Sequence, residues 1–192
     1  MTSLAFVDHH LRVARETIDD DPTPERDAPI LALVAAGAGA YFGELVRREM
    51  GATWIGDGND PRRLRLLLAP QFLHFSPVDQ ALEVVVGEEL ADDDPRLPAG
   101  PPIDTAFRVR TRPLPTDTGH EPPPDAVWLD ERLAEMNPVP ADHYFSLTAR
   151  YETLEMILEL LAQKHASEGQ SPRRFDMADY ASELVPDGQA DA

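Results

Sequence analysis

The chain has 192 residues, 42% of them hydrophobic, which suffices for one folded domain and excludes a wholly disordered protein. It carries 35 acidic against 17 basic residues, and the formal net charge of −18 opposes direct binding to nucleic-acid phosphates and to anionic membranes. It has no cysteine, which excludes disulfides and thiolate catalysis and fits a cytoplasmic protein.

The N-terminal residues have neither a basic segment nor a small-residue cleavage site, so we expect no signal peptide. No uncharged apolar run reaches the roughly 18 to 20 residues that a membrane-spanning helix needs, and we interpret residues 30–46 as a core helix. We expect a single α+β domain over residues 1–170 and a polar, partly disordered C-terminal tail over residues 171–192. Lys164 is the one lysine among 17 basic residues, a bias typical of GC-rich bacterial genomes.

In the first third of the chain the pattern predicts two helices and then short strands. Apolar residues at helical spacing predict a helix over residues 2–19. A second helix is predicted from Asp27, as its N-cap, to about Met50, with Gly51 following its end. Its middle, residues 35–40, consists only of alanine and glycine, and because each glycine costs about 1 kcal/mol of helix propensity, we interpret it as a site of close packing. Short strands are predicted at residues 54–55, 63–69 and 72–75.

The remaining elements alternate helix and strand. Ser76-Pro77 predicts a helix start, which we favour over the strand indicated by the valines at 84–86. After a loop over residues 87–104, residues 105–112 form the clearest predicted strand, and a proline-rich surface segment spans residues 113–124. Helices are predicted over residues 128–136 and 146–165, and the tail can add a short one around Phe175 and Tyr180. This order predicts an α+β fold: a small, mainly antiparallel sheet packed against the Gly/Ala-rich central helix and the long C-terminal helix.

Motifs for catalysis and cofactor binding are absent from the sequence, so we expect no catalytic residues, no metal and no cofactor. There is no Gly-x-Ser-x-Gly and no P-loop, and Gly37-x-Gly39 lacks the third glycine and the preceding strand of a dinucleotide site. His9 and His10 are adjacent, and neighbouring residues on a helix point about 100° apart, which is unsuited to shared metal ligation.

Glu44 is a carboxylate inside the apolar central helix and is the first candidate binding residue. It is placed to pair with Arg48 four residues later or, if it faces inward, with Arg150 near the start of the long C-terminal helix. A pocket between Glu44 and Arg150, with Tyr41 and His143 nearby, would make the chain a small-ligand-binding protein or an enzyme.

Arg108, Arg110 and Arg112 alternate along the predicted strand, so we expect them on one face as further candidate binding residues. If Arg63 and Arg65 lie on the neighbouring strand, this face carries five positive charges. Two interpretations stay open. Either acidic loops of the chain itself neutralise the arginines, or the row docks an acidic protein segment or a small anion.

The sequence Gly39-Ala40-Tyr41-Phe42-Gly43-Glu44, followed by Gly51-Ala52-Thr53-Trp54, resembles small uncharacterised bacterial α+β domains in which an aromatic-x-Gly-Glu helix leads through Gly-x-x-Trp into the first strand. The resemblance covers about 25 residues. It implies an α+β fold and accessory roles such as immunity-like or chaperone-like proteins, and it implies no catalytic residues.

Taken together, these observations predict a non-enzymatic, acidic cytoplasmic accessory protein that acts by binding another protein. They leave its oligomeric state open, and they predict no direct contact with nucleic acid or membrane. The small-ligand site near Glu44 and Arg150 is the alternative. A second alternative is a nucleic-acid mimic built on the acidic clusters at residues 19–21 and 88–94, which we otherwise interpret as solvated loops.

Overall fold

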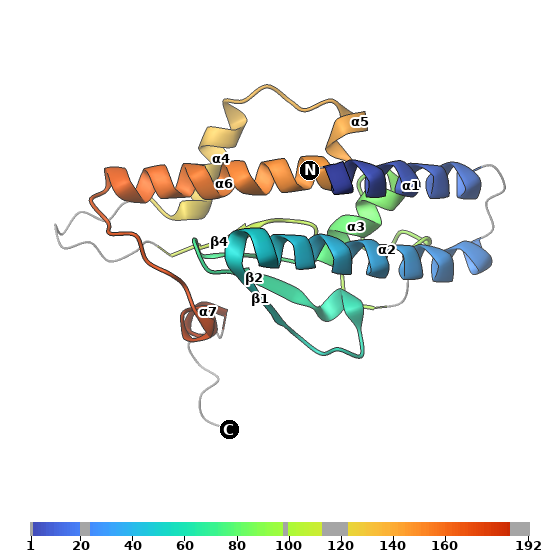
Figure 1. Cartoon of the computed structure of the whole chain (residues 1–192), viewed down its shortest axis with the longest axis horizontal. Helices are drawn as coiled ribbons and strands as arrows, with labels where there is room; N and C mark the ends of the chain where they lie inside the picture. The colour runs from blue at the N-terminus through green and yellow to red at the C-terminus, as the bar shows by residue number, and fades with distance from the viewer. Residues whose placement is uncertain (1, 20–23, 98–99, 113–122, 185–192) are drawn as a thin grey trace.

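The computed structural model describes residues 2–19, 24–97, 100–112 and 123–184 (Figure 1). The chain forms an α+β fold, as the sequence predicts. Its helices are α1 (Thr2–Asp19), α2 (Pro24–Val46), α3 (Pro77–Val86), α4 (Asp125–Ala134), α5 (Ala141–Tyr144), α6 (Leu147–Ser167) and α7 (Met177–Leu184). Its strands are β1 (Ala52–Ile55), β2 (Arg65–Leu68), β3 (Leu73–Phe75) and β4 (Arg108–Val109).

The strands form one antiparallel sheet in the order β1-β2-β3-β4. This confirms the small antiparallel sheet. The strand predicted over residues 105–112 is shorter in the structure, where β4 has only two residues. Strand length depends on the partner as well as on local alternation. β3 has only three residues, and Leu73 and His74 alone pair with β4, opposite Val109 and Arg108. Alternation in the sequence cannot reveal that limit.

α1 and α2 form an antiparallel hairpin, and α2 lies across α3 and the sheet (Figure 1). The inward face of α2 allows close packing at Gly39. A Cβ atom placed there would lie 2.7 Å from the Cα of Val78, at the start of α3. Further along, the rings of Phe42 and Phe75 are 5.9 Å apart between α2 and β3. The small residues of α2 therefore let two backbones meet, as the sequence predicts.

The ends of α2 differ from those predicted. The helix begins at Pro24 rather than after Asp27, and Asp27 is a buried residue within it. Proline is favoured in the first turn of a helix, and Pro24 takes the place that the sequence suggested for Pro29. At the other end, residues 47–51 form a π-helical turn that stops at Gly51, whose φ is +79°. The segment Asp27–Gly51 is long and apolar enough, by length and composition, to cross a membrane, and 39% of its most apolar window is buried in the fold.

Two further helices begin at side-chain caps. Ser76 accepts a hydrogen bond from the amide of Asp79 and so caps α3, which confirms the helix over the alternative strand. Ser146 caps α6 in the same way, by accepting a hydrogen bond from the amide of Ala149. A second cap of α6 comes from far away in sequence, because the carboxylate of Asp8 on α1 accepts from the amides of Leu147 and Thr148 at 2.7 and 3.1 Å.

Part of the C-terminal tail packs on the sheet. The core beneath α2 and α6 contains Leu66 and Leu68 of β2, whereas Leu67 belongs to a second apolar cluster with Phe72, Phe175 and Tyr180. Since alternate residues of a strand point to opposite faces, α7 covers the other face of the sheet. The hydroxyl of Tyr180 accepts from the amide of Leu73 at 2.8 Å and lies 2.7 Å from the carbonyl oxygen of Leu68.

Candidate functional site

Glu44 lies near the C-terminal end of α2 with a half-exposed side chain, and it pairs with Arg47 through two hydrogen bonds of 2.7 and 2.8 Å. These hydrogen bonds hold the pKa of Glu44 below its ordinary value. The partner is neither of those that the sequence suggested, Arg48 or Arg150. The α-helix gives way to the π-helical turn at Arg47, so the regular spacing from Glu44 to Arg48 is not kept.

Arg150 is buried between α6 and α3, where its Nη2 lies 2.9 Å from Oε2 of Glu83. Its guanidinium also lies 4.4 Å from the ring centre of Tyr144, whose hydroxyl accepts a hydrogen bond from Nη1. Burial raises the pKa of Glu83, and the charge of Arg150 opposes that shift. Arg150 thus joins two core helices, and the structure does not bring it to Glu44.

The arginines of the row differ in their exposure to solvent. Arg108 is exposed and bonds to Asp104, whereas Arg110 is buried with its guanidinium 4.9 Å from the ring of Phe72 and its Nε 3.8 Å from Glu183. Both side chains nevertheless point to the face of the sheet that α7 covers. Arg108 lies opposite His74, which lies opposite Leu67 of the second apolar cluster, and Arg110 contacts Phe72 of that cluster. They differ in burial, because β4 ends at Val109 and only Arg110 is covered by α7. Arg112, beyond it, is exposed.

Of the two other arginines expected beside this row, Arg65 shares the partner Asp104 with Arg108. Arg63 pairs with Asp60, and Arg65, on β2, lies 3.9 Å from Asp104. The sequence suggested that Arg65 lies on the strand next to that of Arg108. In the structure β3 lies between β2, which carries Arg65, and β4, which carries Arg108. Carboxylates of the chain itself therefore contact most of these arginines, in accord with the neutralised interpretation.

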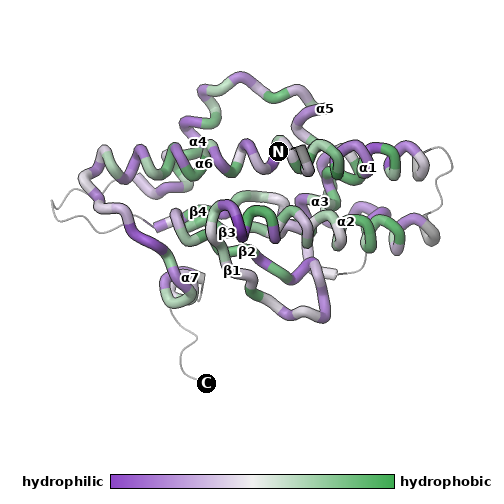
Figure 2. The backbone as a smooth tube through the Cα atoms, viewed as in Figure 1, coloured by the Kyte–Doolittle hydropathy of each residue, from purple (hydrophilic) through white to green (hydrophobic). Residues whose placement is uncertain are grey.

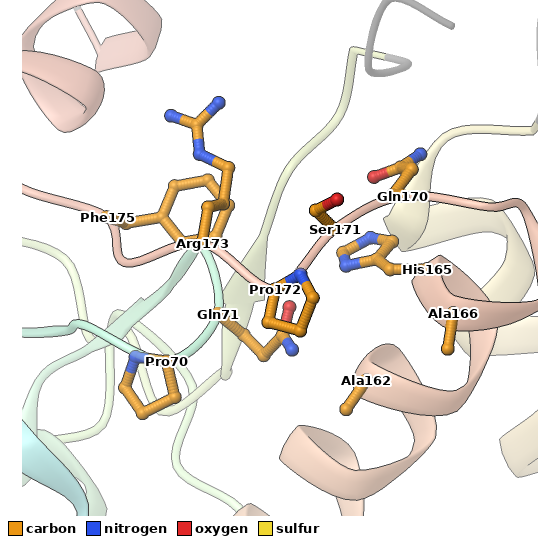
Figure 3. A pocket seen from close by; sticks show the side chains of 10 residues that line it. All are labelled: Pro70, Gln71, Ala162, His165, Ala166, Gln170, Ser171, Pro172, Arg173 and Phe175. Atoms are coloured by element: carbon orange, nitrogen blue, oxygen red, sulfur yellow. The ribbon is translucent and has the colours of Figure 1, made fainter.

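A small pocket of about 90 Å³ lies where the turn after β2, the end of α6 and the segment leading to α7 meet (Figure 3). His165 lines the pocket, and its Nε2 lies 3.0 Å from Oδ1 of Asp125. The same oxygen accepts a hydrogen bond from Nζ of Lys164 at 2.9 Å. Burial opposes ionisation of Asp125, but these two donors hold its pKa below the ordinary value. Gln71 also lines the pocket, and its buried Oε1 has no hydrogen-bond partner within the described ranges. At about 30 Å³ per water molecule, this volume suits a few waters rather than a metabolite.

The outward face of α2 is the largest departure from the expected core helix. Leu33 is 76% exposed, and Ile30 and Tyr41 are exposed on the same helix. Gly37 lies between them, and a Cβ atom placed there would meet no atom of the described residues within 4 Å. Figure 2 shows hydrophobic residues along much of α2. We call Ile30, Leu33, Gly37, Ala40 and Tyr41 the outer face of α2.

The sequence contains a signal for this outer face. Buried residues of α2 recur at positions 31, 35, 38, 42 and 46, which is one complete inward stripe. The outer face repeats at 30, 33, 37, 40 and 41 and is a second apolar stripe at helical spacing. A helix that is apolar on both sides either is fully enclosed or presents one side to a partner.

Comparison with protein-family models, with curated proteins and with solved structures finds no match for this chain.

Proposed function

We propose that this chain is a non-enzymatic cytoplasmic accessory protein that binds another protein through the outer face of α2. The observation that carries the proposal is the exposure of Leu33 in the middle of a second apolar stripe. Burying a leucine side chain stabilises a complex by about 1.5 to 3 kcal/mol relative to leaving it in water. Exposed apolar side chains that share one helix face are characteristic of binding surfaces.

Charge indicates the chemistry of the partner. The chain has a net charge of −18, so a partner with basic side chains around an apolar centre approaches with a favourable long-range field. The small residues Gly37 and Ala40 leave room for a helix to approach α2 closely. The partner we propose is therefore a protein that presents an apolar helix face flanked by lysine or arginine.

The described sites support binding to a protein better than catalysis. Glu44 and Arg150, the residues of the alternative small-ligand site, have separate partners in Arg47 and Glu83. In the acidic cluster at residues 88–94, Glu88 and Asp94 both pair with Arg96. These carboxylates are engaged within the chain, which weakens the interpretation as a nucleic-acid mimic.

A photo-cross-linking amino acid placed at Leu33 in the source cells tests the proposal, with the same amino acid at Val127 as a matched control. Val127 is an exposed apolar residue on α4. We expect one protein with a basic-flanked apolar helix to cross-link at position 33 and not at 127. Binding of that purified protein should then weaken by at least about tenfold in Leu33→Asp and stay unchanged in Val127→Asp.

Three outcomes contradict the proposal. They are equal cross-linking at the two positions, a cross-link at position 33 only to a second copy of this chain, and equal binding by the two aspartate variants. The second outcome would assign the outer face to self-association.

A further inference from the structure

A cleft of about 300 Å³ lies between α1, α5 and the N-terminal end of α6. Its volume is at the lower end of the range for small-molecule sites. Four of the residues that line it are basic or carry an imidazole: His9, Arg12, Arg15 and His143. In a chain with a net charge of −18, this concentration of basic groups is unexpected.

The two arginines of the cleft differ from those of the core and sheet. Arg108 and Arg150 each contact a carboxylate. Within the described part of the chain, Arg12 and Arg15 have no carboxylate within ion-pairing distance. Among the described residues, the one side-chain hydrogen bond of Arg12 runs from its Nη2 to Nδ1 of His9, at 3.3 Å. Both guanidinium charges therefore lack a counter-charge that the described fold supplies.

Asp8 also lines the cleft, but its carboxylate faces the N-terminus of α6. There it accepts from the amides of Leu147 and Thr148 and from the hydroxyl of Thr148. His143 has its Nε2 3.2 Å from Glu152. These acceptors and donors are thus already engaged, and the groups left to face a ligand are on Arg12, Arg15 and His9.

His9 adds a hydrogen-bond donor to the two guanidiniums. Arginine can only donate, so Nδ1 of His9 is the acceptor in its bond with Arg12. A neutral imidazole that accepts at Nδ1 carries its proton on Nε2, which is then a donor. The Arg15 guanidinium lies over Gly87 at the end of α3, where a side chain at position 87 would overlap it.

We propose that this cleft binds a small ligand through a phosphate group. A phosphate presents several oxygen acceptors, and guanidinium groups bind it through paired, charge-assisted hydrogen bonds. Arg12 and Arg15 supply the charge, and His9 supplies a further N–H. The site is independent of the outer face of α2, so each proposal is tested without the other.

Titration of the isotopically labelled protein with sodium phosphate, followed by amide NMR, tests the site. Sodium chloride and sodium acetate at equal ionic strength are the reference titrations. We expect saturable shifts for phosphate at the amides of residues 8–16 and 143–149, with an affinity at least about tenfold above that for acetate. Equal shifts with chloride, equal affinity for acetate, or shifts that lie elsewhere in the chain would overturn the proposal.

Substitutions then assign the residues. Arg12→Gln and Arg15→Gln should each weaken phosphate binding by about tenfold, which corresponds to 1.4 kcal/mol. Arg132→Gln is the matched control, since Arg132 is an exposed arginine on α4 that pairs with Glu135, and its affinity should not change. Arg12 is exposed, so Arg12→Gln keeps the test decisive even if Arg15→Gln disturbs the packing at Gly87. Unchanged affinity in Arg12→Gln contradicts the assignment.

Discussion

Arg150 on α6 and Glu83 on α3 form an ion pair of 2.9 Å in which each side chain is only 7% exposed. Removing two charges from water is costly, and the attraction between them in the core offsets that cost only while both are present. The pair connects the long C-terminal helix to the helix beneath α2. Substitutions in this pair therefore measure how much the contact between α3 and α6 contributes to the stability of the fold.

We predict that Arg150→Met destabilises the fold by about 3 to 5 kcal/mol, because it leaves Glu83 buried without its counter-charge. The double variant Glu83→Gln/Arg150→Met should recover at least half of this loss. The glutamine is neutral and still accepts from the amide of Leu90, as Glu83 does. Urea unfolding followed by circular dichroism measures both free energies. A double variant no more stable than Arg150→Met would show that charge burial is not the cause.

Gly39 and Gly37 make a matched pair on opposite sides of α2. Gly39→Leu places a side chain against the backbone of Pro77 and Val78, and we expect this overpacking to cost about 1 to 3 kcal/mol. Gly37→Ala meets open space and should stabilise the helix by about 0.5 to 1 kcal/mol. Thermal unfolding of the two variants gives the comparison. A thermally silent Gly39→Leu would mean that α2 does not pack on α3 in solution.

Tyr180 fastens α7 to the sheet, and Tyr180→Phe tests the hydroxyl alone. The phenyl ring still stacks on Phe72, 4.2 Å away, but the buried amide of Leu73 loses its acceptor, at a cost of about 1 to 3 kcal/mol. We expect faster hydrogen exchange in residues 175–184 and little change in α6. Ser182→Ala, which removes an exposed hydroxyl of the same helix, is the control. Equal exchange in the two variants would contradict this role.

His74 predicts a pH dependence of stability. Burial, with the charges of Arg65 and Arg108, lowers the pKa of His74 to about 4, although Asp104 acts the other way. An unfolded chain binds this proton near pH 6.5, so the unfolding free energy should fall as the pH falls from 6.5 towards 4. The loss from this one residue is at most about 3 kcal/mol, less where water screens the ring.

His74→Gln isolates this contribution from those of the carboxylates that titrate in the same range. Urea unfolding at several pH values should give a smaller fall in free energy for the variant than for the wild type. Parallel pH profiles of the two proteins would show that His74 is as easily protonated in the fold as in the unfolded chain.

Features carried by neighbouring residues were predictable from the sequence. Ser76, Pro77 and Gly87 mark the two ends of α3 locally, and the helix has those ends despite its three consecutive valines. The extent of β4 and the docking of Tyr180 were not predictable in the same way. Each depends on a partner that is far away in the chain, namely β3 for the strand and Leu73 for the tyrosine.

The candidate sites also combine features that neighbouring residues determine with features that distant partners determine. Alternation placed Arg108 and Arg110 together, and only the fold shows that one is exposed and the other lies against aromatic rings. Arg12 and Arg15 were missed, since whether an arginine meets a carboxylate is decided by tertiary contacts. The spacing of His9, Arg12 and Arg15, three residues apart on a predicted helix, was the available signal.

The cap that Asp8 provides for α6 bears on how the chain folds during synthesis. Asp8 and Leu147 are separated by 139 positions, so this contact cannot form until most of the chain has left the ribosome. At roughly 5 to 20 residues per second, the delay is on the order of ten seconds. Until then α1 lacks its contacts with α6 and can pack only on α2 and α3, which are synthesised earlier.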